Sequence, residues 1–243
     1  MSQSARRNDA QGNKALVIVA HPDDEILGCG ATIRLFVNRG WRARLVIMTA
    51  GVSGRHSHEG SDCKNVTAAQ TALAGQMQRA SKIVGFESTK VFDFPDNRMD
   101  TVSRMDLTHE LIPYVQDYKP DLVLTHHHGD YNWDHTMTFD AALMATRPNP
   151  PDYTPSELWS FEVPSSTERA FQAGDRTFNP NLYVDVSTTI DQKKRALMQY
   201  ESEYRPYPHP RSIEALEYLA RRRGNEVGMA YAEAFHMVRR LVH

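Results

Sequence analysis

The stretch ALVIVAHPDDE (15–25) decides the fold and raises the first question about function. Its apolar residues run without a break into a histidine, a proline and three acids. A short, continuous apolar run is typical of a parallel strand that is buried on both faces. The turn after such a first strand commonly carries glycines that receive a phosphate, which three carboxylates would repel. The sequence therefore predicts a buried first strand and a polar turn that faces a different kind of ligand.

Similar apolar runs alternate with helical patterns along most of the chain. We expect further strands at RLVIMTA (44–50), KVFDFP (90–95), DLVLTH (121–126), ELWSFEVP (157–164) and NLYVDVS (181–187). Helical patterns cover 25–38, 68–84, 105–118 and about 134–147, and we expect mainly helix after Thr189, interrupted by a proline-rich segment at 204–212. This alternation predicts an α/β fold with a doubly wound, mainly parallel sheet and helices on both faces. We expect one domain over 15–243, preceded by a disordered tail over 1–14.

The composition argues against several classes of protein. The 243 residues include 28 basic and 30 acidic ones, for a formal net charge of -2, so nothing indicates nucleic-acid binding. No apolar run approaches the roughly 18 residues of a membrane span, and the first residues lack the apolar segment of a secretory signal. Cys29 and Cys63 are too few for a disulfide framework or a thiolate zinc site. We therefore expect a cytoplasmic protein without a membrane span, and a homo-oligomer is compatible with this composition.

Polar residues follow each of the first four predicted strands. These segments are HPDDE (21–25), GVSGRHSHEG (51–60), DNR (96–98) and HHHGDYNWDH (126–135). Ligands of open α/β sheets bind outside the carboxyl ends of the strands, so we expect the four segments to meet at one edge. The sequence therefore predicts a binding site built from these loops.

The first and last of these segments contain candidate metal ligands. A proline followed by acids would also suit the start of a helix, but that interpretation leaves His21 unexplained. His21 and Asp24 could bind one cation from a tight turn, with Asp23 beside the cation rather than bound to it. His135 would complete a set of two histidines and one carboxylate, although Asp134 next to it could simply cap a helix. Such a set leaves a coordination position open for water, as catalytic zinc requires, and it also suits non-haem iron.

Together these segments resemble the PIG-L/LmbE family of zinc-dependent de-N-acetylases, which remove acetyl groups from N-acetylglucosamine-type sugars. AHPDDE (20–25) matches the first family signature, and GDYNWDH (129–135) matches its Asp-His element. Further similarity lies in FPDNRMD (94–100) and PHPRS (208–212), and the resemblance covers roughly residues 15–240. It implies a Rossmann-like α/β fold.

The resemblance also implies an activity. His21, Asp24 and His135 would hold one zinc ion, for which other divalent metals can substitute, and Asp23 would be the general base. The expected enzyme is a hydrolase that removes an N-acetyl group from an amino sugar or its conjugate, for example a nucleotide-linked sugar, and releases acetate. Two alternatives stay open: a non-haem iron enzyme that uses the same three ligands, and a non-catalytic nucleotide-binding α/β module.

The expected substrate contacts come from the other loops. By the resemblance, Asp96 and Arg55 would hold sugar hydroxyls, and we also expect Arg211 to contact the substrate. Many family members have a histidine three residues before the last ligand, where it polarises the amide carbonyl, but this chain has Asn132. The oxyanion of the reaction would then be stabilised by the Asn132 amide or by His209 in the PHPRS segment.

Overall fold

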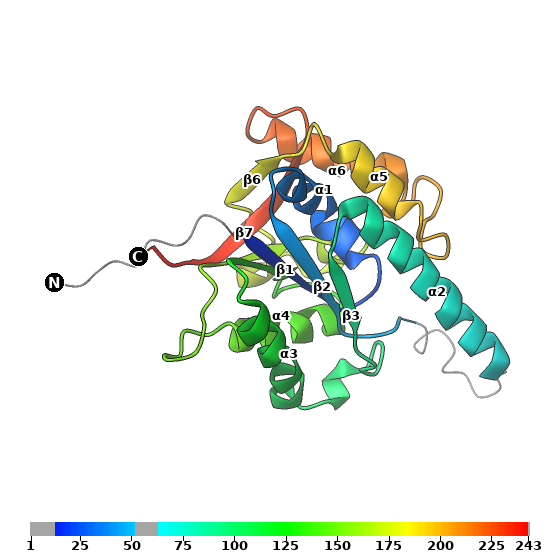
Figure 1. Cartoon of the computed structure of the whole chain (residues 1–243). Coiled ribbons are helices and arrows are strands. Elements are labelled where there is room, and N and C mark those ends of the chain that lie inside the picture. The colour runs from blue at the N-terminus through cyan, green and yellow to red at the C-terminus, as the bar shows by residue number, and fades with distance from the viewer. Residues whose placement is uncertain (1–12, 52–62, 243) are drawn as a thin grey trace.

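The computed structural model describes residues 13–51 and 63–242. Within them, seven strands form a single sheet in the order β3-β2-β1-β4-β5-β7-β6 (Figure 1). The strands are β1 Lys14–Val19, β2 Arg42–Ile47, β3 Ser88–Val91, β4 Leu122–His126, β5 Glu157–Phe161, β6 Leu182–Asp185 and β7 Ala232–Arg240. Neighbouring strands among β1 to β5 are parallel, whereas β7 runs antiparallel to both β5 and β6. The predicted α/β fold with a mainly parallel sheet is confirmed.

Helices cover both faces of this sheet. They are α1 Asp24–Asn38, α2 Cys63–Val84, α3 Arg104–Tyr118, α4 Trp133–Ala145, α5 Ile190–Leu197 and α6 Ile213–Asn225, with short 3-10 turns η2 Met99–Thr101, η3 Thr167–Arg169 and η4 Gly174–Arg176. α1, α2, α5 and α6 pack on one face, and α3 and α4 pack on the other (Figure 1). Each face therefore has its own hydrophobic core.

The first strand shows why its sequence is apolar throughout. Val17 and Val19 point into the core beneath α1 and α2, while Leu16 and Ile18 point into the core beneath α3 and α4. All four side chains are fully buried, and each such burial is worth about 1.5–3 kcal/mol. A strand buried on both faces has no position for a polar side chain, so its pattern is continuous rather than alternating.

The structure corrects the prediction for the last part of the chain, which is not mainly helical. β7 was missed, although it pairs with β5 and with β6. Its sequence begins Ala-Glu-Ala, residues of high helix propensity and low strand propensity, so tertiary pairing overrides the local preference. In the first part of the chain, β3 ends at Val91 and not at Pro95.

The expected tail over 1–14 falls mostly outside the described residues, which begin at 13. β1 starts at Lys14, so the predicted boundary is one residue late. Across the described residues, no helix has the length and hydrophobicity that crossing a membrane requires.

The order of the strands fixes where a ligand can bind. β1 lies between β2 and β4, so the chain winds outward in opposite directions from the β1–β4 pair. The loops after these two strands diverge there and leave a crevice at the carboxyl edge of the sheet. The HPDDE turn and the HHHGDYNWDH segment therefore face each other, as the sequence predicts.

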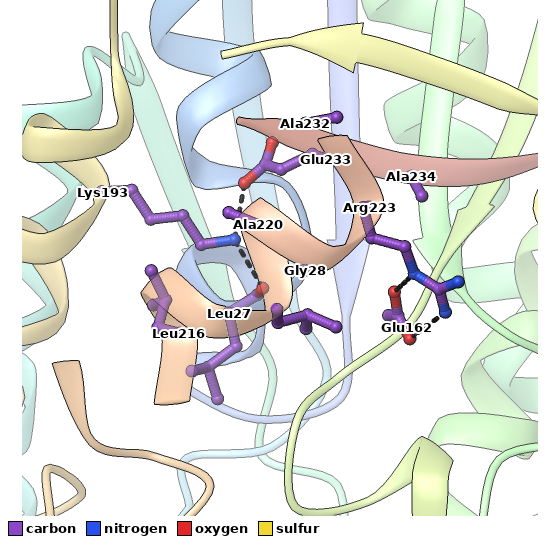
Figure 2. A pocket seen from close by; sticks show the side chains of 11 residues that line it. Leu27, Gly28, Glu162, Lys193, Leu216, Ala220, Arg223, Ala232, Glu233 and Ala234 are labelled. Carbon is purple, nitrogen blue, oxygen red and sulfur yellow. Dashed lines mark hydrogen bonds and ion pairs between the residues drawn. The ribbon is translucent and has the colours of Figure 1, made fainter. Parts of the chain in front are cut away.

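Helix α1, which begins in the HPDDE turn, is held tightly against the sheet. A Cβ atom at Gly28 would clash with the Phe161 ring of β5, so glycine permits this close approach. Lys193 of α5 donates to the Leu27 carbonyl at 2.8 Å and to Glu233 Oε1 of β7 at 2.6 Å (Figure 2). Glu233 also accepts from two backbone N–H groups of α1. A buried ion pair thus anchors the middle of the helix whose first turn enters the site.

Candidate active site

The turn between β1 and α1 is strained where it carries Asp23. This residue has φ 100° and lies in the left-handed region, which non-glycine residues rarely adopt. Its backbone N–H donates to Glu25 Oε2 at 3.1 Å, and Glu25 Oε1 accepts from the Tyr200 hydroxyl at 2.6 Å. Asp23, Glu25 and Tyr200 are all buried. The surrounding hydrogen bonds therefore hold a conformation that the chain would otherwise leave.

The three predicted metal ligands converge in the crevice. His21, Asp24 and His135 each offer a ligand atom, and these atoms all lie within 4.8 Å of one another. Asp24 Oδ2 is 3.3 Å from His21 Nδ1 and 3.2 Å from His135 Nε2. Asp24 Oδ1 is buried and has no hydrogen-bond partner within residues 13–51 and 63–242, so it is available to a cation. The atoms present therefore fit a cation bound by two nitrogens and one carboxylate.

The other nitrogen of His21 faces two more carboxylates. His21 Nε2 lies 3.1 Å from Asp134 Oδ2 and 3.3 Å from Asp96 Oδ1. Asp134 is fixed in turn, because it accepts from the backbone N–H groups of Asn97 and Met99. A proton on Nε2 is thus favoured, which leaves the Nδ1 lone pair for a cation.

His135 is held in the same manner by Asp130, whose Oδ1 lies 3.1 Å from His135 Nδ1. Asp130 also accepts from the hydroxyls of Ser166 and Thr167. Burial lowers the pKa of His135, but the carboxylates of Asp24 and Asp130 outweigh it and raise the pKa to about 9. This part of the site therefore favours positive charge, which is the electrostatic property that a cation site needs.

His126, at the end of β4, packs against the metal-ligand residue His135. Its ring stacks on that of His135 with centroids 3.9 Å apart. His126 Nε2 accepts from the Ala20 N–H at 2.8 Å, so it does not donate to Asp24, which lies 3.5 Å away. Burial lowers the pKa of His126 well below its ordinary value, and its ring is therefore neutral.

Asp23 lies beside the metal-ligand group and is paired with an arginine. Its Oδ2 is 3.0 Å from Arg211 Nη1, and the same nitrogen is 3.0 Å from Glu203 Oε2. Arg211 Nε also donates to Ser165. Burial raises the pKa of Asp23 well above its ordinary value, although Arg211 opposes that effect. A buried carboxylate with raised proton affinity suits a general base.

A cavity of about 440 Å³ opens onto this group. Its lining includes Asp134 and His135, Arg211, and residues 131–133 around the start of α4. Asn132 also lines the cavity and caps α4, since its Oδ1 accepts from the Asp134 N–H at 2.8 Å. Its Nδ2 has no acceptor among the described residues and remains available to a ligand. The volume is typical of a small-molecule site.

Of the other residues predicted to contact the substrate or the oxyanion, some lie at the site and others do not. Asp96 is buried beside His21, and Arg211 lies at the cavity but also against Asp23. His209 is partly exposed, accepts from the Arg211 N–H through Nδ1, and is absent from the cavity lining. Arg55 lies outside the described residues. The structure thus brings the metal ligands, Asp23, Asp96 and Arg211 together but leaves His209 to one side.

Sequence reasoning missed three residues of the site. Asp130 and His126 belong to the HHHGDYNWDH segment, whose many polar residues give no local sign of which ones point inward. Asp130 could have been found by seeking a second carboxylate for a metal-binding histidine, a common arrangement. Glu203 has no motif around it, and only the folded chain places it against Arg211.

Comparisons with known proteins identify the family and the fold of this chain. The PIG-L family profile, described as GlcNAc-PI de-N-acetylase, matches residues 16–146. Among curated relatives, a diacetylchitobiose deacetylase of Thermococcus kodakarensis is 26% identical, covering 93% of this chain and 83% of its own length. A 4-oxalmesaconate hydratase of Pseudomonas putida is 24% identical over 80% of this chain and 76% of its own. The solved N,N′-diacetylchitobiose deacetylase of Pyrococcus horikoshii shares the fold with a TM-score of 0.74 at 20% identity, covering 93% of this chain and 84% of that one.

Proposed function

Because the chain belongs to the PIG-L family of de-N-acetylases, we propose that it is a metal-dependent hydrolase of N-acetylated amino sugars or their conjugates. The observation that carries this proposal is the convergence of the ligand atoms of His21, Asp24 and His135, of which His135 lines a cavity. Asp23 follows His21 in the same turn, and its carboxylate pairs with Arg211, which also lines that cavity. The similarity to a diacetylchitobiose deacetylase supports the substrate class. The products would be acetate and a free amino sugar.

The proposed metal is zinc, held by His21, Asp24 and His135. This donor set suits zinc, and Asp24 Oδ1 is a buried oxygen without a hydrogen-bond partner in the described part of the chain. A zinc ion, when bound, lowers the pKa of a water from about 15.7 to about 7 and polarises an amide carbonyl. Asp134 and Asp130 orient the two imidazoles so that each presents a lone pair to the ion.

In the proposed reaction, the chain moves one proton and stabilises one developing charge. Asp23 accepts a proton as water adds to the acetyl carbon, and returns it to the nitrogen as the C–N bond breaks. Arg211 holds the Asp23 carboxylate in place. The Asn132 Nδ2 group donates to the oxyanion, and we favour it over His209 because Asn132 lines the cavity and His209 does not.

An acetate-release assay on N-acetylglucosamine, N,N′-diacetylchitobiose and a nucleotide-linked N-acetyl sugar tests the proposal, with and without added zinc. Asp23→Ala is expected to retain zinc and lose most turnover, whereas Asp191→Ala, at an exposed carboxylate, is expected to change neither. One relative is named a 4-oxalmesaconate hydratase, so hydration of 4-oxalmesaconate is measured in parallel. Hydration without acetate release from any of the sugars would overturn the proposal, and near-normal turnover in Asp23→Ala would overturn the base assignment.

A further inference from the structure

A second cavity is lined by helices α3 and α4, which lie side by side on one face of the sheet (Figure 1). Its volume is about 400 Å³, within the range of small-molecule sites. The lining comes from the first turns of α3, from the last turns of α4 with Arg147 after it, and from Arg239 of β7. None of these residues lines the cavity at the metal ligands, so the two cavities are separate.

One part of this cavity is an apolar surface that the protein itself does not cover. Met105 is 48% exposed, Leu143 is 37% exposed and Met144 is 42% exposed. Methionine side chains are flexible and adapt their shape to the molecule that they contact. Among the described residues that line the cavity, Asp140 has the only carboxylate, and it pairs with Arg104 Nε at 3.1 Å. The apolar surface therefore lies beside an ion pair that is already neutral.

A β-bulge directs Arg239 toward this cavity. The register of β7 on β5 shifts between Leu158 and Trp159, so Val238 is an extra residue and Arg239 pairs with Leu158, on the face covered by α3 and α4. Bulges commonly redirect a side chain near a functional site. Arg239 Nη2 donates to the Thr146 carbonyl just after α4, which explains one of its N–H groups as a helix cap. Its Nε is buried and has no hydrogen-bond partner within residues 13–51 and 63–242.

The positive charge of the cavity is also not neutralised by the described part of the chain. There, neither Arg239 nor Arg147 forms an ion pair, and Arg147 Nη1 contacts the Met144 sulfur at 3.3 Å. Burial lowers the pKa of Arg239, and no nearby carboxylate opposes that effect. A partly buried guanidinium without a counter-charge costs free energy, so its presence beside an apolar surface indicates a ligand.

We propose that this cavity is a second binding site, separate from the candidate active site, for a small amphiphilic carboxylate. The carboxylate pairs with Arg239 and Arg147, since its two oxygens match the planar fork of a guanidinium. The apolar chain of the ligand covers Met105, Leu143 and Met144. A small inorganic anion would leave that apolar surface in water, and a neutral apolar molecule would leave the guanidinium without a counter-charge, so a ligand with both parts fits best.

Isothermal titration of the full chain with octanoate, octylammonium and acetate tests this site. Octanoate should bind at least about tenfold more tightly than octylammonium, which has the wrong charge, and than acetate, which lacks the chain. Arg239→Met keeps an apolar stem but removes the charge, and it should weaken octanoate binding about 10- to 100-fold. Arg147→Gln, at an exposed position where folding is not at risk, should weaken it in the same direction. Leu143→Glu places a carboxylate beside the apolar chain and should also weaken it.

The matched control is Arg169→Gln, because Arg169 lines the cavity at the metal ligands instead. This variant should bind octanoate as the unmodified protein does. If Arg169→Gln weakens octanoate binding while Arg239→Met and Arg147→Gln do not, the carboxylate binds in the active-site cavity and the proposal is wrong. No octanoate binding at millimolar concentration, or equal affinity for octylammonium, would also overturn it. Sedimentation of Leu143→Glu gives one more test: a change in oligomeric mass would make this surface a contact between copies of the chain and not a ligand site.

Discussion

Asp130→Asn tests how much the metal centre depends on a carboxylate that does not bind the metal. Asparagine can still accept from Ser166 through Oδ1, and its Nδ2 then replaces the oxygen that accepts from Thr167, whose hydroxyl can turn to accept instead, so the loop should keep its shape. What is lost is the negative charge 3.1 Å from His135 Nδ1. Removing a carboxylate that orients a metal-binding histidine typically costs about 10- to 100-fold in metal affinity, so we expect zinc affinity to fall by that factor.

Competition with a chromophoric chelator measures that affinity directly, without a substrate. Asp140→Asn is the matched control, because Asp140 lies on α4, the helix that carries His135, and pairs with the exposed Arg104 at the protein surface. The zinc affinity of the Asp140→Asn variant should equal that of the unmodified protein. If Asp130→Asn also binds zinc normally while its melting temperature is unchanged, then Asp130 does not orient His135 and the reasoning fails.

Three further outcomes follow from the contacts around the site. Lys193→Met leaves the Glu233 carboxylate buried without its cation, so we expect the free energy of unfolding to fall by about 3–5 kcal/mol and Tm by roughly 6–20 °C. Calorimetry measures this change, and the double variant Lys193→Met/Glu233→Gln should recover part of the lost stability. A proton that binds His135 with a pKa of about 9 must leave before a metal can bind, so zinc affinity should rise with pH up to about 9. Burial lowers the pKa of His21, but the carboxylates of Asp134, Asp24 and Asp96 outweigh it and raise that pKa well above its ordinary value as well. Calorimetric titration in two buffers should therefore show about two protons released per ion near neutral pH, and a pH-independent affinity would contradict this. Tyr200→Phe removes the hydroxyl that holds Glu25, which should cost about 1.5–3 kcal/mol in thermal stability and lower turnover while zinc stays bound.

The parts of the site that could be predicted from sequence are those set by a single strand and turn. His21 and Asp24 belong to one tight turn, and the apolar run before them defines a buried strand that ends there. His135 could be placed opposite them because the carboxyl ends of neighbouring parallel strands share one edge.

The parts that could not be predicted depend on long-range packing. β7 has the composition of a helix and becomes a strand because two existing strands offer it hydrogen bonds. Arg211 and Asp23 come from opposite ends of the chain, and no local pattern indicates that a residue expected to contact substrate also pairs with the base. His209, two residues before Arg211, does not line the cavity, because the packed elements on either side set the direction of this loop.

At Asp23, the left-handed backbone lowers thermal stability, whereas the side chain at the same position is needed for turnover. Glycine adopts φ 100° without penalty, whereas a residue with a Cβ atom bears a cost on the order of 1–3 kcal/mol. Asp23→Gly should therefore melt at a higher temperature than Asp23→Ala, although both lack the carboxylate. Laboratory selection for thermal stability alone should therefore favour glycine at this position, whereas selection for activity should favour aspartate.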